Sequence, residues 1–174
     1  MKHNPKLLRS IVMLLIVVVN IGCDQLSKNV VRNNINPAEP IYFLNNHLVL
    51  MNVENSGAFL SLGTSLSGPL KWLILSVLPV LALTASLLYL LFYRQVSVIF
   101  SVGLCFVIGG GIGNIADRIL YGSVTDFLFF HTGIFRTGVF NLADISIMLG
   151  ACLMVIPLLM QEVKKFSYRH ADKS

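Results

Sequence analysis

The sequence has 174 residues, of which 55% are hydrophobic and only 12% are charged. A typical soluble domain carries about 25% charged residues, so part of this protein's surface must face something other than water. The formal net charge is +5, but no basic run is interleaved with aromatic residues, and we therefore exclude nucleic-acid binding. The length suits a single domain, residues 1–174.

Four apolar segments are each long enough to cross about 30 Å of hydrocarbon, which takes roughly 20 residues of helix. Irregular backbone cannot face lipid, so these segments are predicted to be helices. The sequence thus predicts an all-α integral membrane protein with four transmembrane helices. The spans cover residues 7–32, 70–93, 96–118 and 139–162.

The first span begins like a secretory signal, with a basic start, an apolar centre and then Cys23. The stretch ending at Cys23 resembles a weak lipobox, the cleavage site of lipoproteins. Asn20, however, occupies the position where such sites usually carry Leu, and three more spans follow. We therefore expect an uncleaved first span.

Basic residues set the predicted orientation. They lie before the first span, in the short turn between the second and third spans, and after the fourth span. Such residues are enriched in cytoplasmic loops, so both termini are expected in the cytoplasm. The loops at residues 33–69 and 120–138 are then extracytoplasmic.

The two outer loops contain regular structure of their own. Residues 41–44 and 47–53 are strand-like, Asn45 and Asn46 form a turn between them, and residues 124–130 supply another strand-like run. We expect a small sheet on the outer membrane face. Residues 58–69, rich in Gly and Ser, are expected to form a short mobile helix or lid.

Four of the eight acidic residues lie in or beside apolar segments: Asp24, Asp117, Asp126 and Asp144. An ionisable group at the bilayer centre costs at least about 2.5–3.5 kcal/mol, so such groups face the protein interior and commonly mark function. The three cysteines, by contrast, all lie in apolar stretches and are expected to be buried small hydrophobes. The sequence has no CxxC motif and no His/Cys cluster, so a disulfide framework is not predicted. A metal site is not predicted.

Asp24 and Lys28 are four residues apart on a predicted helix and can form an ion pair. We interpret the pair as structural; the alternative is that Lys28 helps to position substrate or catalytic groups. Gly109 and Gly113 have the spacing that lets two membrane helices approach closely.

Asn114 and Arg118 share one helix face, and Arg118 and Asp117 are candidates for pairing with acids on other segments. Structural and functional roles are equally open for this group.

Asn141 and Asp144 share a face early in the fourth span, and Asp126 lies in the apolar strand of the second outer loop. If Asp126 and Asp144 meet in one buried pocket, they cannot both ionise cheaply, and a shared proton would make them an acid–base pair. A proton relay and a structural polar network remain open as alternatives. His47 and His131 are expected to be surface residues.

Five motifs in order resemble those of bacterial lipoprotein signal peptidase, or signal peptidase II, over residues 7–165. Thr125 stands where many members have Val or Ile. The motifs are Asp24-Gln25-x-x-Lys28, Asn55-Ser56-Gly57-Ala58-Phe59, Gly109-Gly110-x-x-Gly113-Asn114-x-x-Asp117-Arg118, Val124-Thr125-Asp126-Phe127 and Phe140-Asn141-Leu142-Ala143-Asp144.

This resemblance implies an inner-membrane aspartic endopeptidase that needs no metal or cofactor. Its substrates would be diacylglyceryl-modified prolipoproteins, cut just before the lipidated cysteine near the extracytoplasmic face. It further implies a small extracytoplasmic β-cradle, a short periplasmic helix and sensitivity to globomycin-type inhibitors. The implied site consists of Asp126 and Asp144 as the catalytic pair, Asn55, Gly57, Asn114, Arg118 and Asn141 as active-site support, and Asp24 and Lys28 as a structural pair.

The main rival is a small non-catalytic transporter or proton-conducting protein that uses the same buried aspartates. The acids cluster near one side of the predicted membrane rather than along a whole span, which favours an enzyme. A third reading is an assembly subunit packed through Gly109 and Gly113. Nothing in the sequence demands more than a monomer, and nothing assigns the acid and the base within the pair or indicates which lipoproteins are preferred.

Overall fold

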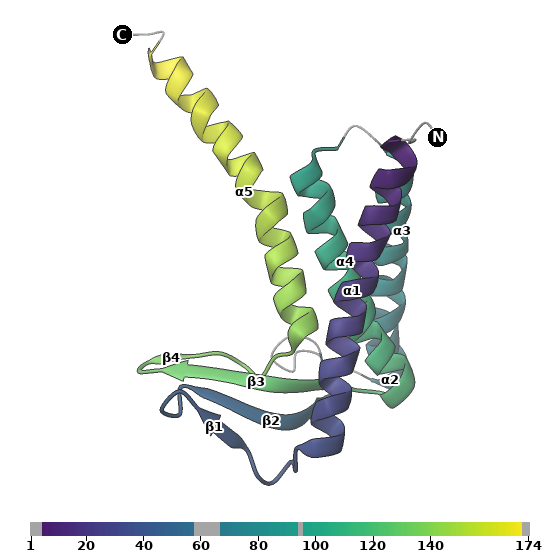
Figure 1. Ribbon diagram of the computed structural model, residues 1–174, viewed down its shortest axis with the longest axis vertical. Coiled ribbons are helices and arrows are strands. Elements are labelled where there is room, and N and C mark those ends of the chain that lie inside the picture. The colour runs from purple at the N-terminus through teal and green to yellow at the C-terminus, as the bar shows by residue number, and fades with distance from the viewer. Residues whose placement is uncertain (1–4, 58–66, 94–95, 172–174) are drawn as a thin grey trace.

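The computed structural model describes residues 5–57, 67–93 and 96–171. The helices are α1 (Pro5–Asn34), α2 (Gly68–Trp72), α3 (Leu78–Phe92), α4 (Val98–Tyr121) and α5 (Leu142–Ala171); a π-helical turn, Leu73–Val77, joins α2 to α3. Helices α1, α3 and α4 lie side by side, a sheet projects beneath them, and helix α5 packs on the group by its first half and then diverges (Figure 1).

Within the described part of the chain, three helices are long and apolar enough to cross a membrane. They are Leu7–Asn34, Gly68–Phe92 and Val98–Tyr121, with mean hydropathy between 2.0 and 2.3. Leu142–Pro157 of α5 is a shorter apolar helix. Many large apolar side chains of these helices are exposed, as expected for surfaces that face lipid. The chain is thus a multi-pass membrane protein.

Helix ends follow local chemistry. Ser97 caps α4, because its side chain accepts a hydrogen bond from the Phe100 N–H at 3.2 Å, and Gly122 ends α4 in the left-handed conformation with φ of 78°. The π turn lies just before Pro79. Proline has no N–H to donate to the preceding turn, and a local change of helix type is a common response.

The sheet is antiparallel, in the order β1 (Ile41–Phe43), β2 (Leu48–Asn55), β3 (Val124–Thr132) and β4 (Phe135–Arg136). The predicted strands are confirmed, as is the turn before β2, where Asn45 and Asn46 have φ of 53° and 69°. The short strand β4 was not predicted. The expected helix or lid at residues 58–69 lies outside the described residues, apart from its last three.

Glycines let α4 pack closely on its neighbours. A Cβ atom added to Gly109 or Gly113 would collide with Asn20 or Asp24 of α1, which confirms the predicted close approach. Two further contacts were missed. A Cβ on Gly110 would collide with the Ala143 carbonyl of α5, and Gly103 and Gly150 lie equally close to each other's backbone. Helix α4 is therefore locked to α1 on one side and to α5 on the other.

Candidate active site

The first turn of α5 is closed by a reciprocal pair of hydrogen bonds. The Asp144 N–H donates to the Asn141 Oδ1 at 3.0 Å, and the Asn141 N–H donates to the Asp144 Oδ2 at 3.1 Å. This arrangement is a capping box with Asn141 as the N-cap. Asn141 therefore precedes the helix, which begins at Leu142. The residue before Asn141, Phe140, is still bridged to Leu128 of β3. The bridge brings the start of α5 against β3.

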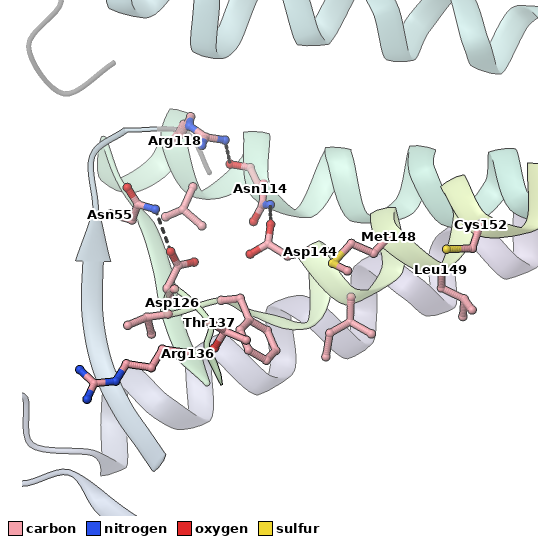
Figure 2. A pocket seen from close by; sticks show the side chains of 15 residues that line it. Asn55, Asn114, Arg118, Asp126, Arg136, Thr137, Asp144, Met148, Leu149 and Cys152 are labelled. Atoms are coloured by element: carbon pink, nitrogen blue, oxygen red, sulfur yellow. Dashed lines mark hydrogen bonds between the residues drawn. The ribbon is translucent and has the colours of Figure 1, made fainter. Parts of the chain in front are cut away.

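Asp126 of β3 and Asp144 of α5 point into the same space (Figure 2). Each of their four carboxylate oxygens accepts one hydrogen bond from an amide. Asp126 accepts from Asn55 Nδ2 at 2.8 Å and from Asn141 Nδ2 at 2.6 Å. Asp144 accepts from Asn114 Nδ2 at 2.9 Å and from the Asn141 N–H. Asn141 thus touches both carboxylates and fixes their relative position.

Asp126 is only 3% exposed, and this burial has the largest influence on the pKa of its carboxyl group. Burial raises the pKa of the Asp126 carboxyl to about 6, and the nearby charge of Asp144 raises it further, against the lowering effect of hydrogen bonds from Asn55 and Asn141. A carboxyl with this pKa exchanges its proton readily near neutral pH, as an acid–base group must.

The two carboxyl groups line a cavity of about 770 Å³. One end is polar, with Asn55, Asn114, Arg118 and the aspartates. The remainder runs along one face of α5 and the segment before it, and is largely apolar (Figure 2). Its apolar lining there is Val139, Phe140, Ile145, Met148, Leu149 and Cys152, and the segment before α5 adds Arg136, Thr137 and Gly138. The sequence did not reveal this apolar wall, because its residues have the same apolar character as lipid-facing ones. The expected burial of the cysteines is correct for Cys105 and wrong for Cys23 and Cys152, which are exposed. Among the described residues, no group of three His, Cys, Asp or Glu side chains could hold a metal ion.

Arg118 connects the cavity to the end of β2. Its Nη2 donates to the Gly57 carbonyl at 2.9 Å and its Nη1 to the Asn114 carbonyl at 3.3 Å. Gly57 is buried, and its N–H donates to the Asn55 Oδ1 at 2.9 Å. The structure therefore brings together all five predicted supporting residues, with Asn141 as the fifth.

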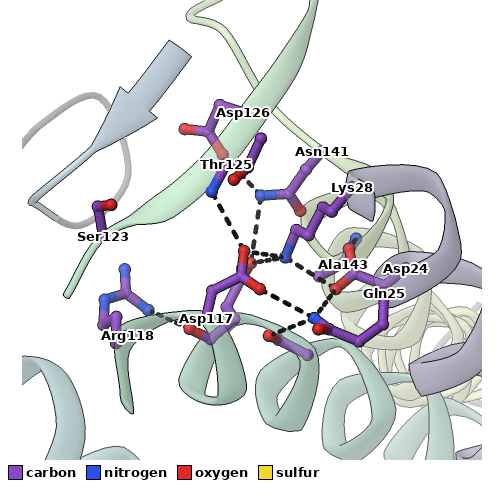
Figure 3. Close-up of polar contacts among 12 residues, drawn as sticks. Asp24, Gln25, Lys28, Asp117, Arg118, Ser123, Thr125, Asp126, Asn141 and Ala143 are labelled. Carbon is purple, nitrogen blue, oxygen red and sulfur yellow. Dashed lines mark hydrogen bonds and ion pairs between the residues drawn. The ribbon is translucent and has the colours of Figure 1, made fainter. Parts of the chain in front are cut away.

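A buried ion cluster lies close to Asp126 (Figure 3). The predicted pair is present, with Lys28 Nζ at 2.8 Å from Asp24. Asp117 lies 3.3 Å from Lys28 and 2.8 Å from Arg32. The suggestion that Asp117 pairs with acids was wrong, since its partners are the bases of α1. Arg32 was missed, although it follows Lys28 by four residues and so shares its helix face.

The cluster also holds the two elements that carry the carboxylates. Asp24 Oδ1 accepts from the Ala143 N–H at 2.9 Å, next to Asp144. Asp117 Oδ2 accepts from the Thr125 N–H at 3.1 Å, next to Asp126. Each buried acid of the cluster thus anchors the backbone beside one residue of the pair.

Other polar candidates lie elsewhere. The Thr125 hydroxyl faces away from the cavity, accepting from Arg32 Nε at 2.7 Å and donating to Glu54 at 2.8 Å. It therefore adds no hydrogen bond to the carboxylate pair. His47 lies in the turn immediately before β2, and its Nδ1 is 2.9 Å from the carbonyl of His131 on β3. Neither residue lines the cavity.

The fold and the site define a multi-pass membrane protein with a paired-carboxylate cavity at one end of its helices, as in a membrane-embedded hydrolase. Residues 16–160 match the family model described as signal peptidase (SPase) II. The chain belongs to the signal peptidase II family and is a protease of that family.

Named relatives and solved structures agree with this assignment. The chain is 33% identical over 153 residues to the lipoprotein signal peptidase of Clostridium acetobutylicum, covering 87% of this chain and 96% of the relative. It is 35% identical over 151 residues to that of Clostridioides difficile, covering 87% and 97%. A solved structure described as a bacterial membrane enzyme superposes with a TM-score of 0.76 at 26% identity, covering 88% of this chain and 91% of that one.

Proposed function

We propose that the chain is an aspartic endopeptidase that cleaves diacylglyceryl-modified prolipoproteins just before the lipidated cysteine, with Asp126 and Asp144 as its catalytic pair. One observation carries the proposal: both carboxyl groups line one cavity, and Asn141 touches both of them. Lipoprotein signal peptidases with this sequence pattern supply the substrate class.

The chemistry follows from a pair that holds one proton. The ionised carboxylate takes a proton from a water molecule between the two groups, and that water attacks the scissile carbonyl carbon. The protonated carboxyl donates to the carbonyl oxygen and then a proton passes to the departing amine. The acid and base roles are assigned to the pair and not to one residue.

The neighbouring polar groups prepare the site for this reaction. Asn55, Asn114 and Asn141 donate to the carboxylates through neutral amides, which keep the pair in place without adding charge. The Arg118 guanidinium, held by the Gly57 carbonyl, supplies positive charge beside the cavity. Such a group stabilises the oxyanion that forms on the scissile carbonyl.

The apolar wall of the cavity suits a substrate that arrives from the membrane. In this proposal α5, whose helix is 30 residues long, is the fourth span, and the termini lie in the cytoplasm. The sheet and the carboxylate pair then lie near the extracytoplasmic face of the inner membrane. The diacylglyceryl group stays among membrane lipids while the lipobox enters beside α5, where globomycin-type inhibitors would compete. The monomer contains every proposed site residue.

A gel-shift cleavage assay tests the proposal. Purified protein in detergent is mixed with a diacylglyceryl-modified prolipoprotein, and wild type is compared with Asp126→Asn and Asp144→Asn. Glu39→Gln, the same change at an exposed acid outside the cavity, is the matched control. We expect cleavage by wild type and the control, and none by the folded pair variants.

The opposite results have distinct meanings. Full activity of either pair variant would remove Asp126 and Asp144 from the chemistry. A wild-type protein that is inert on lipidated substrate would instead call for a liposome assay of charge movement, which a proton-conducting protein would give.

A further inference from the structure

Lys28 makes one contact that its ion cluster does not explain. The side chain is fully buried, and its ammonium group has three N–H donors. Two of them face Asp24 and Asp117, at 2.8 and 3.3 Å. The third reaches out of the cluster to the Oδ1 of Asn114, at 2.9 Å.

This third contact determines which way the Asn114 amide points. An ammonium group only donates hydrogen bonds, so Asn114 must turn its oxygen toward Lys28 and its NH2 group away from it. The NH2 group then donates to Asp144 Oδ1 at 2.9 Å. With the amide reversed, an NH2 group would face the ammonium, and the amide oxygen would face a carboxylate.

The same orientation extends to the other carboxylate. Asn114 Oδ1 also accepts from the Nδ2 of Asn141, at 3.1 Å. That Nδ2 group donates to Asp126 at 2.6 Å. The hydrogen-bond direction set at Lys28 thus runs through two asparagine amides to both members of the pair.

We infer that Lys28 is a positioning residue for the carboxylate pair, acting through the amide of Asn114. The inference rests on the proposed function and deepens it. Lys28 lies on α1, which contributes none of the residues that line the cavity. Asn114 is therefore its most direct route to the reaction, because Lys28 touches Asn114 and Asn114 does line the cavity.

Gln25 provides a matched control for a purely structural role. Its Nε2 donates to Asp24, Asp117 and the Gly113 carbonyl at 3.0–3.1 Å, so it supports the same cluster. It has no hydrogen bond to Asn114. Removing Gln25 weakens the cluster without releasing the amide, whereas removing Lys28 does both.

A double-mutant cycle tests the inference. Lys28→Met and Gln25→Met are each made in wild type and in Asn114→Ala, and kcat and KM are measured on lipidated prolipoprotein for the folded fraction. We expect Lys28→Met to lower kcat roughly 10²-fold with KM little changed, because misplaced catalytic groups cost rates of that order. In the Asn114→Ala background it should lower kcat little further.

Gln25→Met should reduce thermal stability, leave kcat close to wild type, and combine additively with Asn114→Ala. Lys28→Met removes the cation that pairs with the buried Asp24 and Asp117 and leaves no polar group in its place. Lys28→Gln, which keeps a hydrogen-bonding side chain, is therefore tested beside it. Its amide is neutral and can accept as well as donate, so it no longer fixes Asn114, and kcat should fall here too.

Additive effects of Lys28→Met and Asn114→Ala on kcat, or full kcat in either Lys28 variant, would overturn the inference. Failure of both Lys28 variants to fold would also overturn it, because the lysine would then serve the fold as a whole. These outcomes are separate from failure of the proposed function, which shows as activity in Asp126→Asn or Asp144→Asn.

Discussion

We expect the free energy of unfolding to depend on pH because Asp126 titrates, and we expect Asp126→Asn to abolish that part of the pH dependence. The folded-state pKa of this carboxyl is raised from 3.8 to about 6 by burial. A raised pKa means that the folded protein binds the proton more tightly than the unfolded chain does. The associated stability is fully present below pH 3.8 and is lost as the pH rises through 6. A pKa difference of this size corresponds to up to about 3 kcal/mol at 25 °C.

The measurement is the free energy of unfolding in detergent micelles, for wild type and Asp126→Asn, between pH 4 and pH 7. Taking the difference between the two proteins at each pH cancels the other titrating groups. We expect wild type to lose up to about 3 kcal/mol relative to the variant over this range. In an Asp144→Asn background the loss should shrink, since the Asp144 charge contributes to the raised pKa. A difference that stays constant from pH 4 to pH 7 would refute the reasoning.

Three further predictions concern helix packing, the N-cap of α5 and the Thr125 hydroxyl. Gly113→Ala forces a methyl group into the Asp24 carboxylate and should lower the free energy of unfolding by about 1–3 kcal/mol, measured by thermal unfolding. Gly22→Ala, where the added methyl group meets no neighbour, should instead raise it by up to about 1 kcal/mol. Equal effects of the two substitutions would contradict the close packing at Gly113. Asn141→Ser keeps an N-cap but loses the amide donor to Asp126, so the cleavage rate should fall roughly 10²-fold. The variant should remain about 1 kcal/mol more stable than Asn141→Ala, which has no capping side chain. A wild-type cleavage rate in Asn141→Ser would disprove the bridging role of Asn141. Thr125→Val removes a buried hydroxyl that faces away from the cavity, and it should lower stability by about 1–3 kcal/mol without changing kcat. A lower kcat with unchanged stability would show that Thr125 acts on the carboxylate pair.

The sequence was informative where a single element carries the signal. Apolar runs predicted the long helices, and alternating strand-like residues predicted β1 to β3, because these patterns depend on local periodicity. The acids were conspicuous because charge is so expensive in apolar segments. The Asp24–Lys28 pair followed from spacing along one helix.

Relations between elements were not available from those patterns. Asn141 caps α5 and also donates to Asp126 on β3. The cap is local to the sequence, whereas the contact with Asp126 depends on how β3 and α5 meet. Arg32 and Lys28 reach Asp117 across 85 and 89 positions of sequence. The capping box itself has a local signal, an Asn three residues before an Asp, but the same spacing also fits two side chains on one helix face.

The contact between α4 and α5 has a consequence for how this protein can vary. The two helices touch at Gly110 with Ala143, and again seven residues along each helix at Gly103 with Gly150. Two turns of helix separate these points, about 10.5 Å, and at both of them the backbones themselves are in contact. Asn114 lies one turn of α4 beyond Gly110, and Asp144 directly follows Ala143 on α5. The spacing of these two backbone positions therefore depends on two backbones in contact and not on the side chains that face outward. Those outward-facing residues are free to vary with the surrounding membrane while the distance between the backbones at Asn114 and Asp144 stays constant.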